Sequence, residues 1–235
     1  MTLETKPRGQ DYQGLHVLAD DDPRWGRDPV EQAKAACAAG VEVVQLRAKH
    51  ATDEESLRWA KAIRELTRAS GTRFVVNDRF DLALLAEADG VHLGQGDLPP
   101  SALPAARAQL AVGRSTHTPE QLDATRDEDV DYVAFGPVFG TTSKASEYEE
   151  RGLAALRGAV RRAAPRPLIA IGGITPDHLG RLADAGVRGF AVISAVAAAA
   201  DPEEAARKLS LQFRAERERA GMGTGTSAGA RADSA

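Results

Sequence analysis

The feature that most constrains the fold of this chain is an alternation of short apolar runs with helical patterns, repeated eight times. The apolar runs have the length and composition of buried strands. Strands are predicted at Leu15–Leu18 (closing on Ala19 and Asp20), Glu42–Leu46, Arg73–Asn77, Gly90–Leu93, Ala111–Ser115, Asp131–Phe135, Pro167–Ile171 and Arg188–Ser194. Helices are predicted at about Pro29–Ala39, with Asp28 as N-cap, and at Asp53–Ser70, Arg79–Glu87, Pro100–Leu110, Pro119–Asp127, Gly152–Ala163, Thr175–Ala185 and Pro202–Arg219.

Strictly alternating strands and helices indicate a parallel sheet, and a closed barrel of eight strands leaves no edge strand exposed. A single-domain α/β fold, the (β/α)8 TIM barrel, is therefore predicted, with an open doubly wound sheet as the alternative. The chain of 235 residues suits such a barrel. The predicted division is a loose N-terminal lead-in over residues 1–13, the barrel over residues 14–219 and a disordered tail over residues 220–235, rich in Gly, Ser, Thr and Ala.

Charge and composition exclude several kinds of partner. A net charge of −4 gives no electrostatic reason to expect nucleic acid or an anionic membrane as the main partner. No apolar run reaches the roughly 18 residues of a membrane span, and residues 1–10 are polar, so the cytoplasm is the expected location. The single cysteine, Cys37, leaves no internal disulfide or cysteine-based metal cluster and is expected in the core.

The residues that follow the predicted strands point to a site for anions, because barrel enzymes place their active sites at the carboxyl ends of the strands. Gln45 and Arg47 alternate with the aliphatic Val44 and Leu46, so they are expected to face the barrel mouth, with Lys49 just beyond. A surface charge at a strand end would explain Lys49 equally well. It would not explain a glutamine between two aliphatic residues.

Two carboxylates follow neighbouring strands. Asp78 comes directly after Asn77, and Asp97 lies in the loop after Leu93. Adjacent strands lie about 4.8 Å apart, so both carboxylates could reach one ion, and Mg²⁺ binds proteins through one or two carboxylates plus phosphate oxygens. The structural alternatives are a helix N-cap for Asp78 and a turn residue for Asp97.

Further polar groups follow the remaining strands. Residues 136–144, GPVFGTTSK, gather Thr141, Thr142, Ser143 and Lys144 in a loop that offers hydroxyls and an ammonium to a phosphate, although a hydrophilic turn would have the same composition. Ser115 is expected to reach the mouth, Thr118 to be an N-cap, and His117 to be a positioned, hydrogen-bonded histidine rather than a general base.

A second anion site is predicted after the last two strands, where barrels commonly bind phosphate. Gly172-Gly173 follows the seventh strand and allows backbone N–H groups to approach an anion. Ile193 and Ser194 end the eighth. The residues thus predict one metal-assisted subsite and one metal-free phosphate subsite, and they favour chemistry driven by leaving-group stabilisation.

Taken as a set, seven motifs resemble the thiamine phosphate synthase (thiamine monophosphate pyrophosphorylase) family over most of residues 15–196. They are VQLRAK, VNDR, GVHLGQGDLP, GRSTHT, DYVAFGPVFGTTSK, IAIGGI and VISA. The resemblance implies a transferase of thiamine biosynthesis. It implies that 4-amino-2-methyl-5-(diphosphooxymethyl)pyrimidine is joined to 4-methyl-5-(2-phosphooxyethyl)thiazole, releasing diphosphate with the help of Mg²⁺.

The resemblance also implies roles for individual residues. Asp78 and Asp97 would bind the metal, and Arg47, Lys49 and Lys144 would be catalytic. The pyrimidine diphosphate would be held by Gln45, Arg47, Lys49, Asn77, Ser115 and Lys144. The thiazole phosphate would be held by Thr141, Thr142, Ser143, Gly173, Ile193 and Ser194. Ser143 replaces a threonine common in the family and keeps its hydroxyl, whereas residues 145–151 lack the Pro/Gly-rich run expected after Lys144.

Two alternatives stay open. A thiazole tautomerase shares the barrel and some motifs, but it has no diphosphate to ionise, so the charged residues favour the synthase. The second alternative is a non-catalytic barrel that binds phosphorylated thiamine precursors without turnover. The sequence leaves open the oligomeric state, a homo-oligomer included, and the order of substrate binding.

Overall fold

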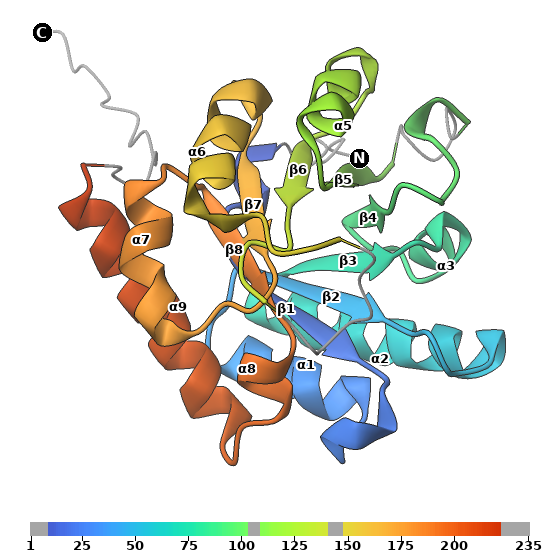
Figure 1. The fold of residues 1–235 in the computed structure, drawn as a ribbon. Coiled ribbons are helices and arrows are strands. Elements are labelled where there is room, and N and C mark those ends of the chain that lie inside the picture. The colour runs from blue at the N-terminus through green and yellow to red at the C-terminus, as the bar shows by residue number, and fades with distance from the viewer. Residues whose placement is uncertain (1–8, 103–108, 141–147, 222–235) are drawn as a thin grey trace, which may run out of the picture.

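The computed structural model describes residues 9–102, 109–140 and 148–221. Its eight parallel strands pair in sequence order, and β8 pairs with β1 to close the barrel, as predicted. In Figure 1 the strands lie at the centre and the helices surround them. The strands are β1 (Gly14–Asp20), β2 (Val43–Arg47), β3 (Arg73–Asn77), β4 (Gly90–Leu93), β5 (Ala111–Thr116), β6 (Tyr132–Phe135), β7 (Leu168–Ile171) and β8 (Gly189–Val192).

The helices between the strands largely follow the predicted pattern. They are α1 (Pro29–Ala38), α2 (Asp53–Ser70), α3 (Phe80–Leu85), α5 (Pro119–Ala124), α6 (Gly152–Ala163), α7 (Leu179–Asp184), α8 (Ser194–Ala197) and α9 (Pro202–Arg219). The predicted caps are confirmed. Asp28 and Glu31 form a reciprocal capping box on α1, and Thr118 accepts from Gln121 N on α5.

Several predicted helices are shorter than expected because 3₁₀ turns take over their ends. Thr125–Asp127 (η4) continues α5, Pro176–His178 (η5) precedes α7, and Pro100–Ala102 (η3) is the described part of the helix predicted to Leu110. Residues 103–108 of that helix lie outside the described residues. A further 3₁₀ turn, Pro23–Trp25 (η2), connects β1 to α1. Among the described residues, no helix combines the length and hydrophobicity that crossing a bilayer requires.

Strand β8 ends earlier than predicted. It stops at Val192, because the backbone of Ile193 leaves the extended region (φ −115°, ψ −80°) and Ser194 begins α8. This short helix was not expected from the sequence. It places Ser194 at a helix start rather than in a strand.

The N-terminal lead-in was expected to be loose, but its described part is ordered. Gly9–Tyr12 forms a 3₁₀ turn (η1), and the side chain of Tyr12 is fully buried. The Tyr12 ring stacks on Tyr132 with centroids 5.2 Å apart, and its hydroxyl donates to the Asp89 carbonyl at 3.0 Å. Because Asp89 immediately precedes β4, Tyr12 lies at the amino ends of the strands and closes the barrel floor.

Apolar side chains divide into two clusters according to the alternation along each strand. Val44 and Leu46 belong to the cluster between the barrel and its helices, whereas Val43 belongs to the cluster inside the barrel. Gln45 and Arg47 share the face of Val43, so they point inward as predicted. The first half of each strand therefore fills the barrel, and the last residues line its mouth.

Candidate active site

Three charged residues from three successive loops meet at the mouth. Lys49 follows β2, Asp78 follows β3, and Asp97 lies in the loop after β4. The Lys49 ammonium forms an ion pair with Asp78 Oδ2, and the carboxyl groups of Asp78 and Asp97 lie close enough to shift each other's pKa. Gly94 N donates to Asp97 Oδ2 at 2.6 Å. The structure thus brings together the two carboxylates that the sequence placed on neighbouring strands.

Asp78 adopts an unusual backbone conformation, with φ of +65°. Side chains other than glycine rarely occupy this region, and such residues occur preferentially at functional sites. Its N–H donates to the His92 carbonyl at 2.8 Å, which ties the turn to β4. The N-cap of α3 is Arg79 and has no side-chain cap, so a capping role for Asp78 is wrong. The turn role predicted for Asp97 is correct, because its carboxylate accepts a hydrogen bond from Gly94 N within the same loop. The additional interaction with Asp78 is not explained by a turn role.

The two carboxyl groups have opposite pKa shifts. Burial raises the pKa of Asp97, and its hydrogen bond to Asp78 raises it further. Burial also acts to raise the pKa of Asp78, but hydrogen bonds with Lys49 and Asp97 outweigh it and hold that pKa below its usual range. Two carboxylates in contact disfavour a second negative charge, so the pair either retains a proton or binds a cation.

Arg47 is held by an aspartate that the sequence analysis did not place in the site. Asp20, the last residue of β1, is fully buried and pairs through Oδ2 with Arg47, its register partner on β2. Oδ1 of Asp20 accepts from Trp25 Nε1 at 2.7 Å, while the amide side chain of Gln32 bonds both the N–H and the carbonyl of Asp20. The signal that could have found it is a carboxylate at the end of an otherwise apolar strand.

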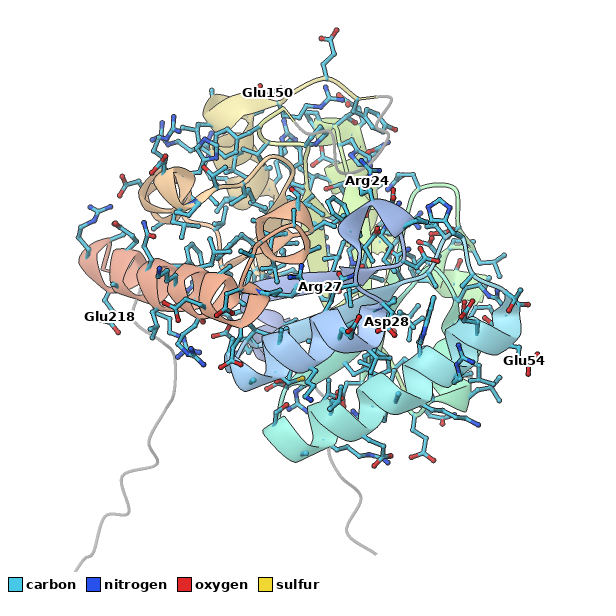
Figure 2. The ribbon with its side chains drawn as sticks, turned by 90° about the horizontal axis from the view of Figure 1, so that it is seen from below. Arg24, Arg27, Asp28, Glu54, Glu150 and Glu218 are labelled. Carbon is cyan, nitrogen blue, oxygen red and sulfur yellow. The ribbon has the colours of Figure 1, made fainter. Side chains whose placement is uncertain are left out.

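Arg47 thus ends β2 in a pre-formed ion pair with Asp20. Its side chain is 13% exposed, which leaves part of the guanidinium accessible to a ligand. The segment that leads from β1 to α1 carries Arg24, Arg27 and Asp28, which Figure 2 labels.

The neighbouring β4–β5 exits carry a chain of hydrogen bonds. Ser115 Oγ lies 2.8 Å from His92 Nε2, and the other ring nitrogen of His92 lies 3.1 Å from the Tyr132 hydroxyl. Gln95 Nε2 donates to the Ser115 carbonyl at 2.6 Å. His92 was not identified as a site residue from the sequence, because a histidine within a strand carries no distinctive signal. Of the other predicted residues, Gln45 is 4% exposed and Asn77 ends β3.

The β6–β8 side of the mouth is built from close backbone contacts. Gly173 has φ of +60°, and a Cβ there would collide with the Gly140 carbonyl oxygen and the backbone of Phe139. Ile193 is 8% exposed and Ser194 is exposed, both just after β8, which pairs with β7. The remaining predicted ligands, Thr141, Thr142, Ser143 and Lys144, lie outside the described residues, as do residues 145–147.

His117 is a positioned histidine, as predicted. Its Nδ1 lies 2.6 Å from the Gly136 carbonyl oxygen, its N–H donates to Gln121 Oε1 at 2.7 Å, and its ring stacks on Tyr148. These contacts connect the β5 exit to the β6 loop. They account for the residue without a catalytic role.

The fold and the charged mouth together define a (β/α)8-barrel enzyme. The family model described as thiamine monophosphate synthase matches residues 15–196, more than half of the chain. The chain therefore belongs to the thiamine monophosphate synthase family, which confirms the resemblance found in the motifs. It is an enzyme of the transferase class in thiamine biosynthesis.

Individual relatives agree with this assignment. A thiamine-phosphate synthase from Anaeromyxobacter dehalogenans is 47% identical over 206 residues, covering 87% of this chain and 89% of that protein. One from Natronomonas pharaonis is 43% identical over 207 residues, covering 86% and 94%. The solved thiamine phosphate pyrophosphorylase from Pyrococcus furiosus is 33% identical with a TM-score of 0.79, covering 90% of this chain and 98% of that one.

Proposed function

We propose that this chain condenses 4-amino-2-methyl-5-(diphosphooxymethyl)pyrimidine with 4-methyl-5-(2-phosphooxyethyl)thiazole to give thiamine phosphate and diphosphate. The observation that carries the proposal is the contact between Asp78 and Asp97, flanked by Lys49 and by the Asp20–Arg47 pair. A mouth with this combination of acidic and basic groups suits a diphosphate bound together with a divalent cation. Family membership supports the same reaction.

The donor set fits magnesium. Mg²⁺ prefers oxygen ligands, keeps several waters and needs only one or two carboxylates when a substrate phosphate supplies further oxygens. Burial and the neighbouring Asp78 raise the pKa of Asp97, so a cation bound beside the pair would relieve the repulsion between the two carboxylates. Asp78 and Asp97 would hold the ion, which when bound would neutralise charge on the departing diphosphate.

The chain's own residues then have distinct tasks in the reaction. Arg47 and Lys49, with Lys144 on the β6 loop, would stabilise the negative charge that develops on the diphosphate as its bond to the pyrimidine methylene breaks. Gln45, Asn77 and Ser115 would position the pyrimidine diphosphate. The electron-rich aminopyrimidine stabilises the methylene cation, and the thiazole nitrogen attacks it.

The second substrate would occupy the β6–β8 side. There Gly173, Ile193 and Ser194, with Thr141, Thr142 and Ser143, would hold the thiazole phosphate. The support is positional: the loops after β7 and β8, together with a short extra helix such as α8, are a common phosphate site in barrels of this type. Placing the nitrogen next to the reacting carbon supplies the remaining acceleration through orientation.

The test is to supply both substrates with Mg²⁺ and measure diphosphate release together with thiamine phosphate formation. Stoichiometric release of the two products supports the proposal. Isomerisation of thiazole phosphate without diphosphate release would assign the chain to the tautomerases. Binding of either phosphorylated substrate without turnover would assign it a binding role.

A further inference from the structure

A cleft lies at the opposite end of the barrel from the active site. It has a volume of about 540 Å³ and lies between the amino ends of β1 and β8 and the carboxyl-terminal half of α9. Small-molecule sites typically occupy roughly 300–1,000 Å³, so the space suits a ligand. We call it the arginine cleft, after the lining residues Arg188, Arg214 and Arg217.

Arg217 is the buried centre of the arginine cleft. Arg217 is 7% exposed, and its Nε has no hydrogen-bond partner among the described residues. Its other nitrogens donate to neutral acceptors at long range, the Arg188 carbonyl at 3.3 Å and Gln13 Oε1 at 3.5 Å. A buried charge is costly unless it is paired, so this guanidinium is poised to accept an anion.

The surrounding charges leave the cleft positive. Arg214 pairs with Glu42 Oε1 at 2.6 Å, and the other oxygen of Glu42 accepts from Leu15 N at 2.9 Å, so that carboxylate is already used. Burial lowers the pKa of Arg217, and the like charge of Arg188 lowers it further. Three arginines but only two carboxylates, Glu42 and Asp11, are among the residues that line the cleft. The Asp11 carboxylate lies 3.7 Å from the guanidinium of Arg73, so its charge is partly balanced from outside the cleft.

We propose that the arginine cleft binds a small anion with at least two oxygen acceptors, a phosphate monoester or a dicarboxylate. The anion would accept from the terminal N–H groups of Arg217 that are left over from its contacts with the Arg188 carbonyl and Gln13, and from Arg188. Guanidinium groups match such ligands because their N–H donors lie in a plane and can engage two oxygens at once. The site is at the barrel floor and does not depend on the reaction proposed for the mouth.

The test uses the full chain, with inorganic phosphate and malonate as probes in calorimetric titrations. Arg188→Gln and Arg217→Gln should each weaken binding of the preferred probe about tenfold, the effect of losing one charge-assisted contact. Whichever probe binds more tightly identifies the class of ligand. Arg188 is exposed, so its variant tests the proposal even if Arg217→Gln folds poorly.

Arg219→Gln is the matched control. It removes the same charge from α9, but Arg219 pairs with Asp184 and Glu216 and does not line the cleft. Anions bound at the mouth contribute equally to all variants, so a difference between Arg188→Gln and Arg219→Gln belongs to the cleft. Crystals soaked in tungstate should place the anion beside Arg217. Equal affinities in the two variants, or tungstate at the mouth alone, would overturn the proposal.

Discussion

The two ends of the barrel use charged residues in opposite ways. At the mouth, the acidic groups of Asp78 and Asp97 contact each other, and Asp78 adopts a strained backbone conformation. At the floor, Asp89 Oδ2 accepts from Arg64 at 2.9 Å and from Phe74 N at 2.7 Å. Asp89 at the floor is thus satisfied by partners within the fold, whereas Asp78 and Asp97 at the mouth are coupled to each other. The difference indicates that Asp89 contributes to stability, whereas Asp78 and Asp97 contribute to function.

The largest expected effect is on activity at the mouth. Asp78→Asn should lower kcat/KM for the synthase reaction by about 100-fold or more, because it removes one of the two proposed metal ligands and the partner of Lys49. It should change the melting temperature little. If the proposed Mg²⁺ dependence holds, activity of the wild-type enzyme should also fall when EDTA removes divalent cations and return when Mg²⁺ is added. Asp81→Asn is the matched control, since Asp81 lies three residues away and pairs with Arg79. A comparable loss of activity in both variants would show that the effect is not specific to the acidic pair at the mouth.

The largest effect at the floor should be on stability. Asp89→Ala should lower the free energy of unfolding by about 3 kcal/mol, because it leaves Arg64 and the N–H of Phe74 without their buried partner. Urea denaturation measures the loss, and kcat at a temperature where the variant is folded should stay near the wild-type value. A drop in kcat with unchanged stability would contradict the proposed difference between the two ends.

Crowding at the β7 exit offers a third comparison. Gly173→Ala should destabilise the protein by about 2 kcal/mol and raise the KM for thiazole phosphate, because the added Cβ would meet the Gly140 carbonyl. Gly26→Ala is the control. Gly26 has a similar φ of +64°, but nothing lies within 4 Å of an added Cβ. Gly26→Ala should cost about 1 kcal/mol from the backbone alone. Equal effects would mean that crowding at Gly173 is unimportant.

The floor should also respond to acid through His16. Burial lowers the pKa of His16 to about 4 from the ordinary 6.5, so the folded state favours the neutral ring. The unfolded state then binds a proton at higher pH than the folded state does, and stability falls as the pH drops from about 6.5 towards 4. About 2 kcal/mol should be lost between pH 7 and pH 5. Denaturation of His16→Gln over the same range should show a smaller pH dependence.

The smallest expected effect tests the support of Arg47. Asp20→Asn keeps the size of the side chain but removes the charge that orients the guanidinium, so KM for the pyrimidine diphosphate should rise about tenfold. The KM for the thiazole phosphate should stay unchanged. Asp22→Asn is the control, because Asp22 pairs with the exposed Arg24 at 2.5 Å. An equal rise in both KM values would indicate a general distortion of the mouth instead.

The site was predictable from the sequence where a residue's role follows from its place in a strand. The inward direction of Gln45 and Arg47 follows from the two-residue period, and Asp78 and Asp97 follow adjacent strands, so their proximity could be expected. The helix caps at Asp28 and Thr118 were predictable because capping is a local interaction. Asp20 and His92 were missed, since a side chain at a strand position does not reveal its partner on the neighbouring strand.

The sequence by itself determined the order of the eight strands, the residue that faces inward at each strand position, and the approximate ends of the strands other than β8. These depend on periodicity and local hydrogen bonding, which a short window of residues contains. Only the tertiary structure decided which side chains pair: Asp20 with Arg47, Lys49 with Asp78, and Tyr12 with Tyr132. Those contacts depend on the register of neighbouring strands and the closure of the barrel, which join residues far apart along the chain.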